Sequence, residues 1–163
     1  MRNRPLVSDW SDVTPDITRA YDAAGRLTLL DNVNARLTYA YDAANQLLAE
    51  TTRLAGSAVD RAVAYGYNPD GNRATVTYPD GRVASYSYTA RNQIAAIASD
   101  ASTVAAYAYD FAGRRLIKTL ENGARAVYAH DDKGQVLTVD HQTDTMTWLR
   151  FGYAYDADRK SVV

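Results

Sequence analysis

The sequence contains no cysteine and only two histidines, His130 and His141. The absence of cysteine excludes disulfides and metal sites built on thiolates. Two histidines are a narrow basis for a transition-metal centre or for a nucleophile activated by imidazole, and no polar cluster stands outside the repeated pattern of the chain. We therefore predict no catalytic, cofactor-binding or metal-binding residues, no cofactor and no enzyme activity.

An excess of charge of one sign and long apolar runs are also missing. The chain has 18 basic and 19 acidic residues, a formal net charge of −1, which argues against a nucleic-acid partner bound by phosphate neutralisation. No apolar run approaches the roughly 20 residues of a membrane helix, so we expect no membrane span. Phenylalanine is scarce, with two residues against 13 tyrosines. Aromatic rings that carry a hydroxyl suit half-buried sheet faces better than a dry core.

What the sequence does contain is a recurring motif of the form Tyr-Asp-x-x-Gly-Arg-Leu. Its cleanest copies begin at Tyr21 and Tyr109. The first residues of all copies, which we call the anchors, are Tyr21, Tyr41, Tyr67, Tyr88, Tyr109, His130 and Tyr155. They are 20, 26, 21, 21, 21 and 25 residues apart. A period in this range is typical of a repeat architecture.

Each copy predicts a strand, a tight turn and a second strand. Most anchors have another tyrosine two residues earlier, and residues i and i+2 of an extended chain share one face of a sheet. The aspartate can accept a backbone hydrogen bond from two residues on, and glycine or asparagine tolerates positive φ. Further turn signals lie midway between anchors, at 79–81 and 122–123 and more weakly at 31–32 and 99–100. The predicted turn residues are Asp22, Gly25, Asp42, Asn45, Gly71, Gly81, Asp110, Gly113, Gly123 and Gly134.

These signals predict an all-β fold, a repetitive antiparallel β-hairpin meander that forms a curved open sheet. Residues 94–98 are rich in alanine and could form a helical turn, but they occupy the repeat position of residues 115–119, so we assign them to a strand. We divide the chain into an irregular N-terminal segment (1–18), the repeats (19–158) and a tail (159–163). The tail departs from the repeat and resembles a translated sequencing adapter, so we hypothesise that it is not native.

The motif Tyr-x-Tyr-Asp-x-x-Gly-Arg-Leu, repeated about every 21 residues with Asn-Gly or Asp-Gly turns between copies, closely resembles the YD repeat of Rhs proteins. That family includes contact-dependent toxins, wall-associated proteins, insecticidal toxin complexes and teneurins. The resemblance implies a long β-sheet that spirals into a hollow shell, often around a toxic C-terminal domain. By this resemblance we expect a non-catalytic shell segment of a large secreted or cell-surface protein. Its expected partners are the remaining shell repeats and a C-terminal toxin domain.

A carbohydrate-binding or adhesion module is the alternative interpretation. Aromatic rings stacked on a sheet surface could hold sugar rings, whereas cross-strand packing is the simpler role for such rings. The tyrosines that would stack on a glycan are Tyr65, Tyr67, Tyr86, Tyr88, Tyr107 and Tyr109.

Overall fold

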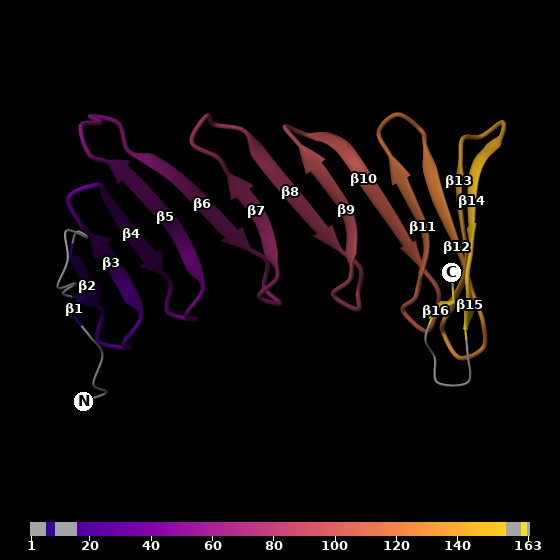
Figure 1. Ribbon diagram of the computed structural model, residues 1–163, viewed down its shortest axis with the longest axis horizontal. Helices are drawn as coiled ribbons and strands as arrows, with labels where there is room; N and C mark the ends of the chain where they lie inside the picture. Colours follow the sequence, from indigo (N-terminus) through magenta and orange to yellow (C-terminus); the bar gives the residue numbers. More distant parts are fainter. Residues whose placement is uncertain (1–5, 9–15, 156–160, 163) are drawn as a thin grey trace. The chain divides into compact units, whose positions relative to one another are not determined.

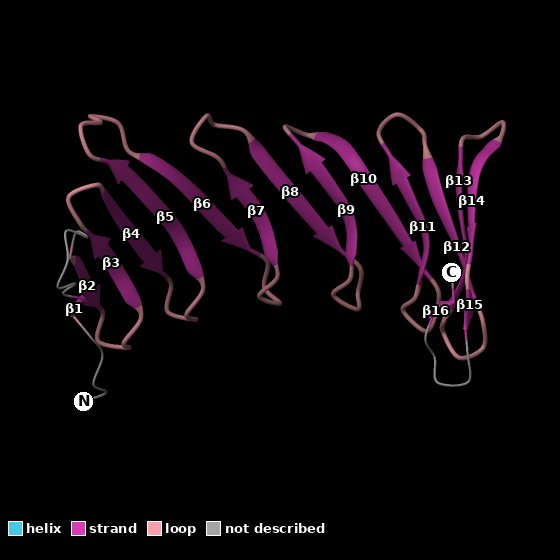
Figure 2. Cartoon of the chain, in the orientation of Figure 1, coloured by secondary structure: helices cyan, strands magenta, loops and turns pink. Residues whose placement is uncertain are grey.

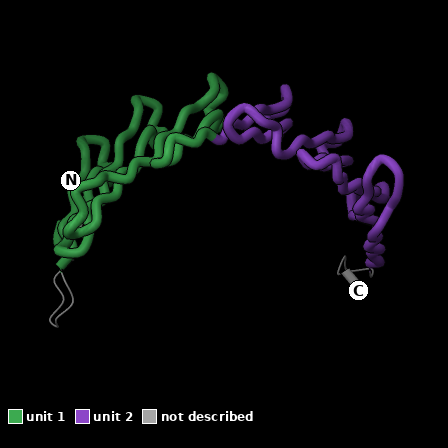
Figure 3. Tube along the Cα trace, turned by 90° about the horizontal axis from the view of Figure 1, so that it is seen from above, with its two compact units in different colours: residues 1–83 green, residues 84–163 purple. Residues whose placement is uncertain are grey.

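The computed structural model describes residues 6–8, 16–155 and 161–162, and it divides the chain into two compact units, residues 1–83 and 84–163 (Figure 3). Every regular element in the described residues is a strand (Figure 2). Unit 1 contains β1 (Val7–Ser8), β2 (Ile17–Tyr21), β3 (Leu27–Asp31), β4 (Ala35–Tyr41), β5 (Leu47–Leu54), β6 (Arg61–Tyr67) and β7 (Arg73–Thr77). β8 (Val83–Tyr88) begins at the last residue of unit 1 and otherwise belongs to unit 2. Unit 2 also contains β9 (Ile94–Ser99), β10 (Ser102–Tyr109), β11 (Arg115–Leu120), β12 (Arg125–His130), β13 (Val136–Gln142), β14 (Thr147–Gly152), β15 (Ala154–Tyr155) and β16 (Ser161–Val162).

The all-β prediction is confirmed, and so is the strand assigned to residues 94–98, which lie within β9. Repeat context outweighs the helical propensity of alanine there, because β9 pairs with strands on both sides. No helix in the described part of the chain is long and apolar enough to cross a membrane. Parts of the predicted N-terminal segment and tail lie outside the described residues, as does Asp156, which follows the last anchor.

Pairing follows chain order within each unit (Figure 1). In unit 1, each strand from β1 to β7 pairs antiparallel with the next. In unit 2 the same holds from β8 to β14, while β15 and β16 form a separate pair. Among the described strands of either unit, the last does not return to pair with the first. Each unit is therefore an open antiparallel meander, as predicted, and Figure 3 shows each one curved.

A β-bulge recurs in the hairpin of every anchor from Tyr21 to His130. In the first hairpin Ala20 lies opposite Leu29, but Tyr21 lies opposite Leu27, so Thr28 is an extra residue in its strand. The same one-residue shift recurs in the other five hairpins. Because a bulge bends its strand and increases the local twist, a bulge at each repeat accounts for the curvature of each sheet.

The register separates two faces of each sheet. One, the tyrosine face, carries residues such as Tyr39 opposite Glu50 and Tyr86 opposite Ile97. The other, the small-residue face, carries Ala40, Ala49, Ala64 and Thr77 in unit 1 and Ser87, Ala96 and Ala106 in unit 2.

Each described sheet is a single layer with almost no interior. Its most buried side chains are Val76, Ala105 and Ala126, which are 6%, 6% and 7% exposed. With so little core, each hairpin depends for its stability on contacts with the hairpins beside it, as expected for a repeat array.

Candidate functional site

The anchor turns have one backbone design, seen first at Asp22. The N–H of Gly25 donates to the Asp22 carbonyl at 2.8 Å, and the N–H of Asp22 donates to the Arg26 carbonyl at 3.0 Å. Gly25 has a φ of 77°. This is a three-residue hairpin loop, a turn followed by one residue in the left-handed region. The left-handed residue directs the next N–H, that of Arg26, to Oδ1 of Asp22 at 2.8 Å.

The other predicted turn residues lie in turns of the same kind. The left-handed position is held by Asn45, Gly71, Asn92, Gly113 and Gly134 at the other anchors and by Gly81 and Gly123 at the opposite edge, with φ between 60° and 86°. Oδ1 of Asp42 and of Asp110 accepts the N–H of Gln46 and Arg114, each at 2.8 Å. We expected the aspartate to accept from two residues on. At Asp22 and Asp110 the backbone N–H groups of Ala24 and Ala112, two residues on, do contribute hydrogen bonds to the carboxylate. The stronger bond comes from the residue four on, because the left-handed residue folds the chain back first.

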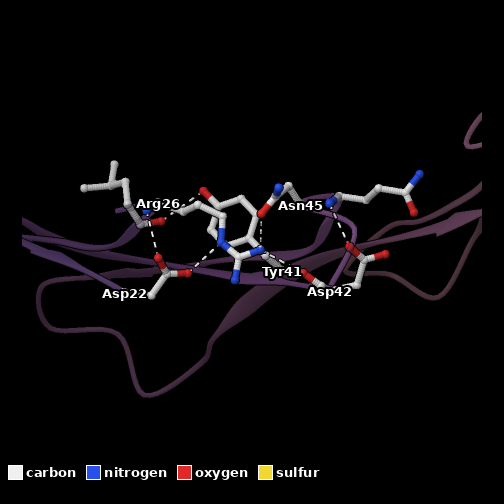
Figure 4. Close-up of polar contacts among 7 residues, drawn as sticks. Asp22, Arg26, Tyr41, Asp42 and Asn45 are labelled. Carbon is white, nitrogen blue, oxygen red and sulfur yellow. Dashed lines mark hydrogen bonds and ion pairs between the residues drawn. The ribbon is translucent and has the colours of Figure 1, made fainter. Parts of the chain in front are cut away.

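A long polar side chain joins the anchor turn at Asp22 to the next one, at Asp42 (Figure 4). The guanidinium of Arg26 binds Oδ2 of Asp22 through Nε at 2.6 Å. Its Nη1 donates to the Asp42 carbonyl at 2.7 Å and to Oδ1 of Asn45 at 2.9 Å. It also lies over the ring of Tyr41, 4.8 Å from the centroid. One side chain therefore orients its own turn and binds the following turn.

The same link recurs farther along the chain. Nε2 of Gln46 donates to the Gly71 carbonyl at 3.2 Å in unit 1. In unit 2, Nε2 of Gln93 donates to the Gly113 carbonyl at 2.7 Å, and Nη1 of Arg114 donates to the Asp131 carbonyl at 2.9 Å. These side chains occupy one repeat position, directly after the left-handed residue.

A second link uses the hydroxyl groups of the anchor tyrosines. Four of them donate to the carbonyl of the residue directly before the bulged residue of the preceding hairpin. The bonds run from Tyr41 to Leu27, Tyr67 to Leu47, Tyr109 to Ile94 and Tyr155 to Val136, at 2.9, 2.9, 2.8 and 2.8 Å. The register shifts at these points, so the hydroxyl satisfies a backbone group where the regular ladder is interrupted.

Hydrogen bonds in two of these turns lower the pKa of Asp22 and Asp110. For Asp22 the backbone N–H of Arg26 is the main cause, followed by the Arg26 side chain. For Asp110 the backbone N–H of Arg114 is again the main cause of a pKa below the ordinary value of 3.8. Both carboxylates are held in the charged form that accepts these bonds.

Acid should therefore destabilise the sheets. Because the pKa of Asp110 is lower in the folded state, its stabilising contribution is present above the unfolded pKa and is lost as pH falls through the folded pKa. We expect a Tm that is nearly constant from pH 7 to 5 and that falls below about pH 4. Asp110→Asn should lower the Tm at pH 7 and reduce the further fall in acid. The exposed Asp132 is the control, and an Asp110→Asn profile equal to that of Asp132→Asn would contradict the prediction.

None of the six tyrosines predicted to stack on sugars is fully exposed; Tyr65, Tyr67, Tyr86, Tyr88, Tyr107 and Tyr109 are all half-buried. Arginines lie over two of these rings, Arg73 over Tyr65 at 4.6 Å and Arg115 over Tyr107 at 5.0 Å from the centroids. In unit 2, Tyr107 and Tyr109 line an open groove of about 500 Å³ beside Phe111, which is 96% exposed. Sugar stacking stays a prediction, and this groove is one place with room for a sugar ring.

Two features of the site were not predicted from the sequence, the turn-to-turn links and the hydroxyl bonds. The sequence did carry a signal for the first. Four residues after the anchor aspartate, or after the residue in its place, each copy from Tyr21 to His130 has an arginine, glutamine or asparagine. These residues are Arg26, Gln46, Asn72, Gln93, Arg114 and Gln135. The second was signalled only by the preference for tyrosine over phenylalanine. Within the described residues, no group of three or more His, Cys, Asp or Glu side chains is arranged to hold a metal ion.

Single-layer sheets of repeated hairpins, with polar links between neighbouring turns, define a β-shell repeat protein. A family model of the teneurin YD-shell matches residues 12–163, and the chain belongs to this family. No curated protein sequence matches the chain.

Solved structures show the same fold. A crystal structure of TcdB2–TccC3–Cdc42 is 14% identical with a TM-score of 0.70, over 98% of this chain and 11% of that one. A structure of TcdB2–TccC3 is 12% identical with a TM-score of 0.69, over 91% and 10%. The pore of the Tc holotoxin of Photorhabdus luminescens, with a mutated TccC3, is 11% identical with a TM-score of 0.55, over 97% and 11%. The chain thus spans about a tenth of the length of these proteins.

Proposed function

We propose that this chain is a non-catalytic structural segment of a large secreted or cell-surface Rhs/YD-repeat protein. In this proposal it forms part of a β-shell that encapsulates a C-terminal toxin or effector domain. Its direct partners are neighbouring shell repeats of the same polypeptide.

The observation that carries the proposal is the repeated link between successive anchor turns. Arg26, Gln46, Gln93 and Arg114 each bind a backbone carbonyl of the following turn. Because the same polar position makes internal contacts in repeat after repeat, its role is to hold neighbouring hairpins together as the wall of a shell. This agrees with the YD-shell family match. A wall of this kind encloses a volume only when many repeats are present, which supports a role within a longer protein.

The test starts from the full-length gene, whose product is purified and treated with protease beside its C-terminal domain expressed alone. We expect more repeats around this segment and a C-terminal domain that survives protease concentrations that degrade the isolated domain. A product with no such domain, or one digested at the same rate in both preparations, would overturn the encapsulation role.

Glycan binding is the second candidate, and the groove beside Phe111 is the observation that favours it. The chain would be screened for retention on immobilised glycans, with Tyr86→Ala combined with Tyr107→Ala as the variant. Retention lost in the variant would support this candidate, whereas no retention by the unaltered chain would reject it.

A further inference from the structure

The hairpin formed by β4 and β5 contains two arginines directly opposite each other. Arg36 pairs with Arg53 in the antiparallel register, and two residues along Thr38 pairs with Thr51. Alternation places all four on the small-residue face with Ala40 and Ala49. Like charges directly opposite each other destabilise a sheet, so this pair needs a compensating group.

The loop after β5 supplies part of that compensation. Arg53 binds both carboxylate oxygens of Asp60, through Nε at 2.5 Å and Nη2 at 2.7 Å. The hydrogen bond from Arg53 is the main cause of a lowered pKa at Asp60, and the charge of Arg36 lowers that pKa further. The contact shows that this face already binds one carboxylate in the two-pronged manner typical of arginine.

Arg36 has no equivalent bond. Within the described part of the chain its guanidinium makes no ion pair, and the hydroxyls of Thr38 and Thr51 make no hydrogen bond. Asp31 lies opposite Arg36 on β3 but is not within ion-pair distance of it. Arg36, Thr38, Thr51, Arg53 and Asp60 line an open cavity of about 270 Å³.

Two irregularities of the repeat coincide here. The spacing from Tyr41 to Tyr67 is 26 residues instead of 21, and the inserted residues form the loop that brings Asp60 to Arg53. In the hairpin of Tyr109, the matching cross-strand position holds Val104 beside Glu121. A departure from the repeat in both side chains and loop length indicates a local role that the shell itself does not require.

We propose that Arg36, Arg53, Thr38 and Thr51 form an oxyanion-binding site for a carboxylate, sulfate or phosphate group of a ligand. Arg36 and the two hydroxyls donate to the anion, and Arg53 contributes its charge and shares its donors between the anion and Asp60. The Asp60 carboxylate competes with the anion for the donors of Arg53. The inference is independent of the shell role, because it depends only on unit 1.

The test is titration of the full chain with sodium sulfate, sodium phosphate and sodium glucuronate, with glucose as the neutral control, followed by NMR or calorimetry. We expect saturable binding of the three anions and none of glucose. Arg36→Gln should weaken binding by about tenfold or more, as expected for loss of one charge-assisted contact. Asp60→Asn should strengthen it, because the resident carboxylate no longer competes.

Arg150→Gln is the matched control, because Arg150 also binds both oxygens of an aspartate, Asp140, at 2.6 and 2.7 Å. It lies in unit 2 opposite Asp140 rather than another arginine, so its loss should leave anion affinity unchanged. Arg36→Lys retains the charge and provides a second variant if Arg36→Gln does not fold. Equal affinity in Arg36→Gln, Arg36→Lys and Arg150→Gln, or no saturable binding at all, would overturn the site. Binding of glucuronate but of neither inorganic anion would assign it to an acidic sugar.

Discussion

Gly113→Val is expected to lower the free energy of unfolding by about 2–3 kcal/mol, because it strains the backbone and displaces a hydrogen bond. Gly113 has a φ of 82°, a conformation that a β-branched residue adopts only with strain. A Cβ at this position would lie 3.1 Å from Nε2 of Gln93. That atom donates to the Gly113 carbonyl at 2.7 Å, so the substitution also disturbs a link between two turns. Urea unfolding followed by circular dichroism measures the loss.

Gly123→Val separates the two causes. Gly123 has a φ of 79°, but no atom lies within 4 Å of the Cβ that a side chain would add. It should therefore show the backbone strain alone, about 1–2 kcal/mol. Equal losses for Gly113→Val and Gly123→Val would show that the Gln93 link contributes nothing. Unchanged stability in both would refute the placement of these glycines in left-handed turns.

Tyr109→Phe is expected to cost about 0.5–1.5 kcal/mol, although it removes a single oxygen atom. The Tyr109 hydroxyl donates to the Ile94 carbonyl at 2.8 Å, beside the bulge in the β8–β9 hairpin. Phenylalanine would leave that carbonyl without its donor while keeping the ring in place. Tyr41→Phe should cost a similar amount in unit 1, because Tyr41 makes the same bond to Leu27. Denaturant unfolding of both single variants and of the double variant measures the effect.

Tyr78→Phe is the control for this pair. Tyr78 is 40% exposed, and within the described residues its hydroxyl makes no hydrogen bond, so its loss should change stability by less than about 0.5 kcal/mol. His130→Tyr is the reciprocal change, since His130 holds an anchor position but has no hydroxyl to donate. It should stabilise the chain by placing a hydroxyl at the Arg115 carbonyl. A Tyr109→Phe cost no larger than that of Tyr78→Phe would contradict the role assigned to the anchor hydroxyls.

Much of the fold could be predicted because each repeat encodes it locally. Tyr-Asp-x-x-Gly specifies a strand end and a left-handed turn, and the alternation of residues such as Tyr39, Ala40 and Tyr41 separates two faces. The repeat also corrected a local ambiguity, since residues 94–98 favour helix by composition and form β9 in the structure. The bulge at each anchor was not predicted. A one-residue register shift depends on how two strands pair, and no residue type marks it.

The candidate sites, too, combine features that the sequence signals locally with features that depend on strand pairing. Arg26 and its repeat equivalents could be recognised as a periodic polar position, but their partners are backbone carbonyls of another turn, which carry no side-chain signature. The pairing of Arg36 with Arg53 was equally hidden, because these residues lie far apart in the sequence and become neighbours only through the register of β4 and β5.

By itself, the amino-acid sequence determined the repeat, the turns, the all-β class and the resemblance to YD-repeat proteins, because each depends on residues close together in the chain. Only the tertiary structure decided the register, the bulges, the contacts between turns and the facing arginines. These depend on which residues of different strands lie opposite each other, and a shift of one residue would exchange the two faces of the sheet.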